Sequence, residues 1–322
     1  MPPRLFPDIP LYIGKKAYDI VKVSAEYRRK PSYVHPCGFL SDGVPVTVGD
    51  ITVTPFLCDH SAFDSYMLLC ESNGRSVLYT GDFRSTGRKS FDRLLSVLPD
   101  SVDILICEGT TLSRPAYLPV SESMLEQQAS ELFKSTDGPV FVLQSSANID
   151  RTVTMYRAAR KNHRVFLQEL YMAQISACAG KNIPNPGFND VFTFITTPAR
   201  YEELEKFRHR VGKNRIAGMN FVMCVRISML PYIKRLSETM SFKGGILVYS
   251  IWDGYRRDEK MKEFLSECTS LGLKIKSLHT GGHADAATIR TLMSKVNAKR
   301  VIPVHTLSPE TLLKLTDDIA TQ

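Results

Sequence analysis

The first third of the chain alternates between short apolar segments and tight turns. Residues 44–48 and 51–57 flank a Gly-Asp pair, and residues 66–70 and 76–79 flank Asn73-Gly74. Asn-Gly is a favoured hairpin turn because both of its residues accept positive φ angles. This pattern predicts antiparallel hairpins in a sandwich-like β structure.

From about residue 121 the pattern changes to apolar strands that alternate with helices. The run 140–143 is followed by a helix over 150–161 and a strand over 165–167. The run 245–249 leads into a helix that ends near residue 271. Strands separated by helical segments predict βαβ units and a parallel sheet.

The last part of the chain is predicted to hold a helix over 284–296 and a strand over 300–304. Histidine-bearing segments of one kind lie on both sides of the βαβ block, so the block is predicted to be inserted into another domain. The predicted fold class is α/β, with domains over residues 1–120, 121–265 and 266–322.

The composition is that of an ordinary globular protein. The 322-residue chain is 43% hydrophobic and 23% charged, and it has no apolar run of the ~18 residues that a membrane span needs. Residues 1–7 lack the apolar segment of a secretory signal. Seven scattered cysteines without a C-x-x-C pair predict reduced thiols and a cytoplasmic location. The net charge of +8 is compatible with a phosphate-bearing partner, although many ordinary enzymes reach it.

Several segments place a histidine or carboxylate at the end of an apolar run. They cover residues 57–61, 79–84, 106–110 and 303–306, and a fifth segment, 279–285, leads into a helix. Strand ends converge at one edge of a sheet, and imidazole and carboxylate are the natural ligands of a catalytic zinc ion. Taken singly, each histidine is more often an ordinary core or surface residue. Taken together, they predict a metal centre.

The order of these motifs resembles the β-CASP family of the metallo-β-lactamase superfamily, which includes ribonuclease J-like enzymes. The motifs are Asp-His-Ser, Thr-Gly-Asp-Phe-Arg, Glu-Gly-Thr, Gly-His-Ala and Pro-Val-His, and together they span nearly the whole chain. The resemblance implies a metallo-β-lactamase αββα sandwich with an inserted Rossmann-like βαβ domain. It implies a metal-dependent ribonuclease that uses two zinc ions. The implied substrate is single-stranded RNA, whose unpaired bases can stack on aromatic side chains.

The resemblance also implies roles for individual residues. His60, Asp82 and His305 would be metal ligands, with Asp82 bridging the two zinc ions. Glu108 and His283 would form a pair near the leaving group, so Asp82, Glu108 and His283 are the candidate catalytic residues.

The βαβ block carries candidate substrate-binding residues. Ser145, Ser146 and Asn148 lie between a strand and a helix, where backbone N–H groups and hydroxyls can hold a phosphate; the alternative is an ordinary helix start capped by Asp150. Three further candidates are Arg226 for a phosphate, Ser228 beside it, and Trp252, the only tryptophan, for a stacked base. A packing role for Trp252 is an equal alternative.

The sequence departs from the family at the His-x-His-x-Asp-His signature, which none of the seven histidines forms. The apolar segment 9–14 resembles the strand that follows this signature in relatives, so four ligands and the first strands are expected to be missing. The chain alone is then expected to hold at most one zinc ion weakly and to be inactive. A second copy or a partner chain would cover the incomplete sheet. Two alternatives remain: a non-catalytic RNA-binding scaffold, and a hydrolase of small esters on the same fold.

Overall fold

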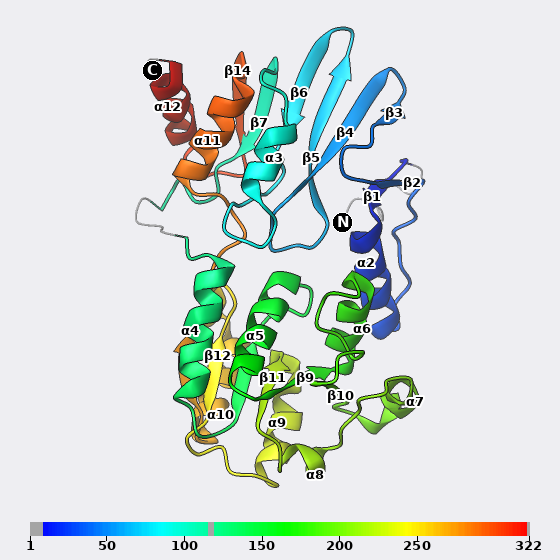
Figure 1. The fold of residues 1–322 in the computed structure, drawn as a ribbon, viewed down its shortest axis with the longest axis vertical. Helices are drawn as coiled ribbons and strands as arrows, with labels where there is room; N and C mark the ends of the chain where they lie inside the picture. The colour runs from blue at the N-terminus through cyan, green and yellow to red at the C-terminus, as the bar shows by residue number, and fades with distance from the viewer. Residues whose placement is uncertain (1–8, 115–118, 321–322) are drawn as a thin grey trace. The chain divides into compact units, whose positions relative to one another are not determined.

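The computed structural model describes residues 9–114 and 119–320, and these form two compact units (Figure 1). Unit 1 contains Met1–Pro119 and Gly281–Gln322, and unit 2 contains Val120–Thr280. The chain therefore leaves unit 1, completes unit 2 and returns, as an inserted domain does. The prediction that residues 1–7 lack a secretory signal concerns residues outside the described ranges.

Unit 1 is built on a six-stranded mixed sheet with the order β14-β7-β6-β5-β4-β3. Its strands are β3 (Val46–Val48), β4 (Ile51–Cys58), β5 (Ser65–Ser72), β6 (Arg75–Tyr79), β7 (Ile104–Glu108) and β14 (Arg300–Val304). Strands β3 to β6 pair antiparallel, whereas β6, β7 and β14 are parallel. A separate two-stranded sheet pairs β1 (Tyr12–Gly14) with β2 (Gly38–Leu40).

The predicted hairpins are confirmed. Asn73 and Gly74 have φ angles of 49° and 71°, and they join β5 to β6 as the Asn-Gly pair requires. The strands do not form the two faces of an antiparallel sandwich, however. They are consecutive strands of one sheet, because β7 and β14 continue it in parallel from β6.

Three helices of unit 1 cover an apolar face of this sheet. They are α3 (Phe91–Val97), α11 (Ala286–Val296) and α12 (Pro309–Ala320). Helix α2 (Lys15–Tyr27) directly follows β1 and adds no described residue to this core. Leu94 of α3, Ile289 of α11 and Leu312 of α12 are buried in one cluster with Met67 and Leu105 of the sheet. The C-terminal helices α11 and α12 therefore belong to the same hydrophobic core as the strands from the first third of the chain.

Unit 2 is a six-stranded parallel sheet with the order β10-β9-β11-β8-β12-β13. Its strands are β8 (Val140–Leu143), β9 (Val165–Glu169), β10 (Val191–Phe194), β11 (Phe221–Val225), β12 (Ile246–Tyr249) and β13 (Lys274–Ser277). The βαβ prediction is therefore confirmed. The sequence placed the end of the insert at residue 265, but β13 joins the same sheet and the unit runs to Thr280.

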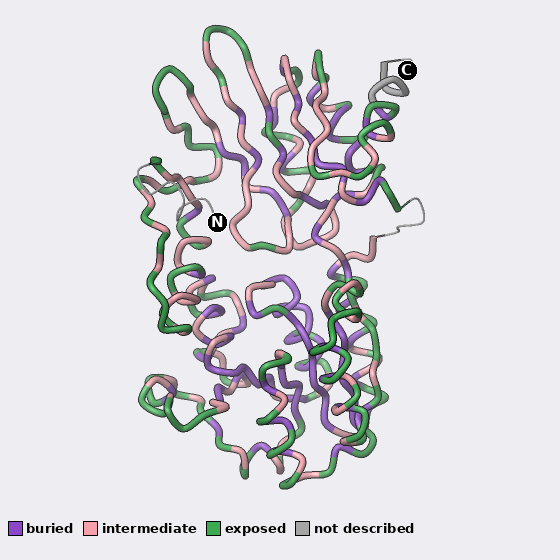
Figure 2. Tube along the Cα trace, turned by 180° about the vertical axis from the view of Figure 1, so that it is seen from behind, coloured by how far each residue is buried: buried purple, intermediate pink, exposed green. Residues whose placement is uncertain are grey.

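The central strands of unit 2 are apolar at every position because helices cover both faces of the sheet. Phe141 and Leu247 face one cluster, with Ile233 of α9 and Phe264 of α10. Their neighbours, such as Val142, face a second cluster, formed with residues of α4 and α5. Figure 2 shows these strands as a buried stretch of the trace. The helices are α4 (Glu122–Lys134), α5 (Ile149–Lys161), α6 (Leu170–Ala179), α7 (Tyr201–Glu205), α8 (Lys213–Ile216), α9 (Leu230–Ser237) and α10 (Glu259–Ser270), with 3-10 turns η1 (Pro198–Arg200), η2 (Ile227–Met229) and η3 (Asp253–Arg257).

All seven cysteines are free, as expected for reduced thiols. Within the described ranges, each helix is too short or too polar to cross a membrane.

Candidate metal centre

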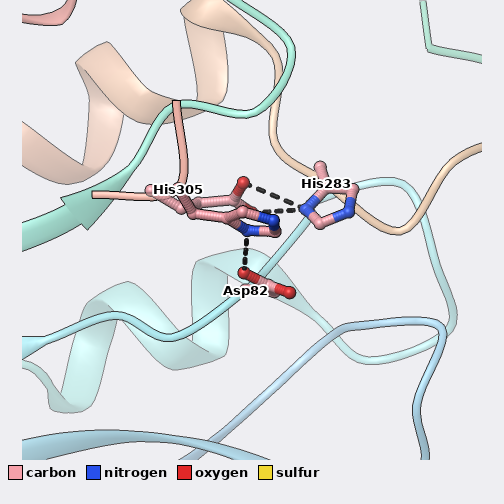
Figure 3. Close-up of side chains that lie close together, drawn as sticks. Asp82, His283 and His305 are labelled. Carbon is pink, nitrogen blue, oxygen red and sulfur yellow. Dashed lines mark hydrogen bonds and ion pairs between the residues drawn. The ribbon is translucent and has the colours of Figure 1, made fainter. Parts of the chain in front are cut away.

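Four side chains meet where the parallel strands of unit 1 end. Asp82 follows β6, Glu108 is the last residue of β7, His305 follows β14, and His283 lies in the loop before α11. Strands β6, β7 and β14 are parallel neighbours, so their carboxyl ends share one edge of the sheet. One ligand atom from each of the four residues lies within 4.8 Å of the others. Figure 3 shows Asp82, His283 and His305 pointing toward one another.

Each imidazole of this group is held by a carboxylate. Nδ1 of His305 lies 2.8 Å from Oδ1 of Asp82, and Nδ1 of His283 lies 3.0 Å from Oε2 of Glu108. The hydroxyl of Thr110 connects the two pairs, since its Oγ1 lies 2.6 Å from Oε2 of Glu108 and 3.2 Å from Nδ1 of His305. The predicted Glu108–His283 contact is present, as is the approach of Asp82 to His305.

Glu108 is the most deeply buried member of the group, with 1% of its surface exposed. Its Oε1 accepts a hydrogen bond of 2.9 Å from the backbone N–H of Phe83, and Oε2 accepts the Thr110 hydroxyl. A buried carboxylate is costly unless such donors satisfy it. These contacts fix the carboxyl group at the base of the site.

The protonation of His283 reflects two opposing effects. Burial of the imidazole lowers its pKa, but the hydrogen bond and negative charge of Glu108 outweigh burial, and the net pKa is raised. Glu108 therefore stabilises the charged form of His283 in the metal-free chain.

His60 lies beside this group but is not one of its four members. Its ring centroid is 5.5 Å from that of His283, and its Nδ1 lies 2.5 Å from the carbonyl oxygen of Gly282. Burial lowers the pKa of His60, which favours the neutral imidazole. When Nδ1 donates to a carbonyl, Nε2 carries the lone pair that a metal needs, and metal-binding histidines commonly have this arrangement.

A buried ion pair that the sequence analysis did not assign supports the loops of the site. Nε of Arg84 lies 2.5 Å from Oδ1 of Asp59, and both side chains are 1% exposed. Arg84 also donates to the carbonyl of Gly281 over 3.0 Å, and Oδ2 of Asp59 accepts the backbone N–H of Lys89. The pair thus ties together the segments that carry His60, Asp82 and His283. The only available sequence signal was an acid and a base, each within two residues of a candidate ligand.

The donor atoms of the site suit a metal ion. Two imidazoles and two carboxylates within 4.8 Å form a mixed nitrogen and oxygen set. Ligands of a tetrahedral zinc ion stand ~2.0–2.2 Å from it, so they are roughly 3.3 Å from each other. The observed separations of 2.8 Å and 3.0 Å within the two pairs need only small movements to reach this spacing. The group can therefore hold a metal ion.

In unit 2, the predicted substrate-binding residues lie after the strands β8, β11 and β12. Asn148 caps α5, because its side chain accepts the backbone N–H of Arg151 over 3.0 Å. The alternative that Asp150 caps this helix is wrong, since Asp150 lies inside the first turn. Ser145 is exposed and Ser146 is buried, so of the two serines only Ser145 is open to solvent.

The other predicted contacts of unit 2 differ in their surroundings. Arg226 forms an ion pair with Glu169 and stacks over the ring of Tyr171 at 4.9 Å. Ser228 is exposed in η2, and Trp252 is 54% exposed. Nη2 of Arg226 is thus already bound to a carboxylate, whereas Trp252 is in part open to solvent. Their roles in binding stay predictions.

Comparison with known proteins establishes the fold only. No model of a known protein family matches the chain, and no curated protein matches it. A solved structure, described as a protein of unknown function from Enterococcus faecalis V583, is similar with a TM-score of 0.77 and 19% identity. The similarity covers 95% of this chain and 72% of that one. At this identity the likeness supports the α/β architecture.

Proposed function

We propose that the chain is by descent a metal-dependent hydrolase of RNA phosphodiester bonds, with the metallo-β-lactamase fold and an inserted β-CASP domain, and that the absence of the His-x-His-x-Asp-His ligands from this sequence leaves it impaired. The observation that carries the proposal is the convergence of Asp82, Glu108, His283 and His305 within 4.8 Å. The four residues come from segments far apart in the sequence, and their order is that of the family motifs. Such a set of imidazoles and carboxylates at strand ends is typical of a catalytic metal site.

Zinc is the proposed metal, because neutral imidazole and carboxylate ligands suit it. Asp82 and His305 would bind it directly, and His60 would present Nε2 beside them. A bound zinc ion would supply Lewis acidity for the phosphate and acidify a water molecule. With the His-x-His-x-Asp-His residues absent from this sequence, a single weakly held ion is proposed here in place of the two of the family.

The chain's own residues have separate tasks in this proposal. Glu108 holds His283 by a hydrogen bond of 3.0 Å and raises its pKa, which favours the protonated imidazole. A protonated imidazole can donate its proton to a departing ribose oxygen. Thr110 fixes the side chains of Glu108 and His305 relative to each other, because its hydroxyl contacts both of them.

The carboxyl edge of the sheet in unit 2 is the proposed RNA-binding surface. Strands β8 and β12 are neighbours. The chain continues from β8 through α5 to β9 on one side of this pair, and from β12 through α10 to β13 on the other side. Ligands of parallel α/β sheets bind at such switch points. Here Ser145 follows β8, while Trp252 and Tyr255 follow β12 with their rings 5.4 Å apart. Exposed aromatic rings beside arginines are suited to unpaired bases and phosphates.

The test is zinc binding and RNA cleavage by the purified chain and its Asp82→Asn variant. We expect the unchanged chain to bind zinc and the variant to bind it about ten- to a hundredfold more weakly. Asp100→Asn is the matched control, since the Asp100 side chain is 94% exposed. Equal zinc affinity of the Asp82→Asn chain would refute the metal site. Cleavage by the unchanged chain is expected to stay at background, and turnover that the Asp82→Asn change abolishes would refute the impairment. RNA binding without zinc binding would instead indicate a non-catalytic RNA-binding protein.

A further inference from the structure

A pocket of about 560 Å³ in unit 2 is lined by three basic residues and by no acidic residue. It lies after β10, between η1 and α9, and shares no residue with the metal centre. Ligand pockets commonly have ~300–1,000 Å³. Arg210, Lys213 and Arg235 supply its positive charge, and Leu204 and Val211 belong to its apolar part.

The three cations are held by main-chain oxygens. Arg235 donates to the carbonyl of Thr196 over 2.9 Å, and Nζ of Lys213 donates to the carbonyl of Arg235 over 3.2 Å. Arg210 donates to the carbonyl of Phe207 over 3.3 Å. Among the described residues, none of the three forms an ion pair with a carboxylate. Within the described part of the chain their positive charge is therefore not neutralised by a paired carboxylate, and a bound anion would neutralise it.

Two tyrosines give the pocket a second chemical character. Tyr201 is 54% exposed, so its ring is available to a planar ligand. The hydroxyl of Tyr232 is buried and has no hydrogen-bond partner among the described residues. Burial raises the pKa of Tyr232 to about 12, so the hydroxyl stays protonated as a donor. Arg235 lies over the Tyr232 ring at 6.0 Å, so the tyrosine and one of the three cations are adjacent in the pocket.

We propose that this pocket binds a nucleotide, with its phosphate at Arg210, Lys213 and Arg235 and its base on Tyr201. The nucleotide is either free or one unit of an RNA strand. Arginine binds phosphate through paired N–H donors, and an aromatic ring stacks on any base. Thr196 and Thr197 line the same pocket and offer polar groups to the ribose. The inference is independent of the metal centre.

The test is calorimetric titration of the full chain with adenosine 5′-monophosphate, adenosine and a 5′-phosphorylated RNA hexamer, in EDTA. The Asp82→Asn background removes any contribution of the metal centre. We expect the monophosphate to bind at least tenfold more tightly than adenosine, and Arg210→Gln/Lys213→Gln to abolish that difference. Lys206→Gln/Lys260→Gln is the matched control, because both lysines are exposed, lie outside the pocket lining and carry the same charge.

The two nucleotide probes distinguish a free nucleotide from an RNA strand. Binding of the monophosphate supports a free nucleotide. Binding of the hexamer but not of the monophosphate supports an RNA strand, provided that the Arg210→Gln/Lys213→Gln variant loses it. Tyr201→Ala should weaken binding of the monophosphate while leaving binding of inorganic phosphate unchanged. Absence of binding by both nucleotide probes at millimolar concentration, or equal losses in the pocket variant and its control, would overturn the proposal.

Discussion

Nδ1 of His283 lies 3.0 Å from Oε2 of Glu108, and the Glu108 carboxyl group is almost completely buried. A buried carboxylate next to an imidazole favours the charged imidazole. Glu108→Gln should therefore lower the pKa of His283 in the metal-free chain. Titration of the histidine resonances by NMR, in EDTA, measures this directly.

The same contact makes stability depend on pH. The folded-state pKa of His283 is raised above that of an ordinary histidine, about 6.5, so the pair stabilises the fold below that pH. The contribution is lost as the pH rises through the raised pKa. Denaturant unfolding of the Glu108→Gln chain should show less of this dependence, and an unchanged pH profile would contradict the pairing.

His305 contacts both Asp82 and Thr110, and we expect His305→Ala to weaken metal binding. Its Nδ1 lies 2.8 Å from Oδ1 of Asp82. Because more than half of the His305 side chain is exposed, the substitution should cost little folding stability. Metal affinity should fall by about ten- to a hundredfold in zinc titrations. His209→Ala, in unit 2, serves as the control; if it weakens zinc binding as much, His305 has no special role.

The hairpins and the buried strands were predictable because local chemistry decides them. Asn73-Gly74 fixes a tight turn at any place in a fold, and the run 140–143 is apolar at each position because helices cover both faces of β8. Strand β13 was missed because its sequence, Lys-Ile-Lys-Ser, is that of a solvated edge. Missing it moved the predicted end of the insert to residue 265.

The site was predictable only in part. Asp82, Glu108 and His305 follow apolar runs, so their position at strand ends could be inferred from the sequence. That β14 pairs with β7, far away in the chain, could not, and this pairing brings His305 to Asp82. The Arg84–Asp59 pair was equally hidden, because a buried ion pair looks like two ordinary surface charges in a sequence.

Gly282 is closely packed against His60. A Cβ atom at this position would lie 2.5 Å from Oγ of Ser61 and 2.8 Å from Cε1 of His60. Gly282→Ala should therefore displace the His60 ring and the loop that carries His283. We expect zinc affinity to fall by about tenfold or more, as for the loss of a supporting contact. Gly218→Ala is the control, since the nearest atom to its Cβ would be 3.8 Å away; zinc binding that is equal in the two variants would rule out this role of Gly282.

Trp252 is the only tryptophan and is 54% exposed, so its fluorescence reports on one site. Stacking of a base on its ring should quench the emission when single-stranded RNA is added. Trp252→Phe should retain most of the RNA affinity, and Trp252→Ala should lose about 1–3 kcal/mol. RNA binding, measured by anisotropy, that leaves the fluorescence unchanged would place Trp252 outside the contact surface.

Arg226 is predicted to have two measurable effects, because it is 27% exposed while its partner Glu169 is 2% exposed. Arg226→Ala leaves the buried Glu169 carboxylate without this partner, which should cost about 1.5–3 kcal/mol of unfolding free energy. The same change should also weaken RNA binding and reduce its salt slope by about one unit, as the loss of one phosphate contact does.

Arg226→Lys keeps the charge, so it should preserve the slope while losing part of the stability. Lys260→Ala, an exposed charge of the same unit, is the control for net charge. A destabilised Arg226→Ala chain with an unchanged salt slope would assign Arg226 to packing alone, because the ion pair with Glu169 would then account for everything the side chain does.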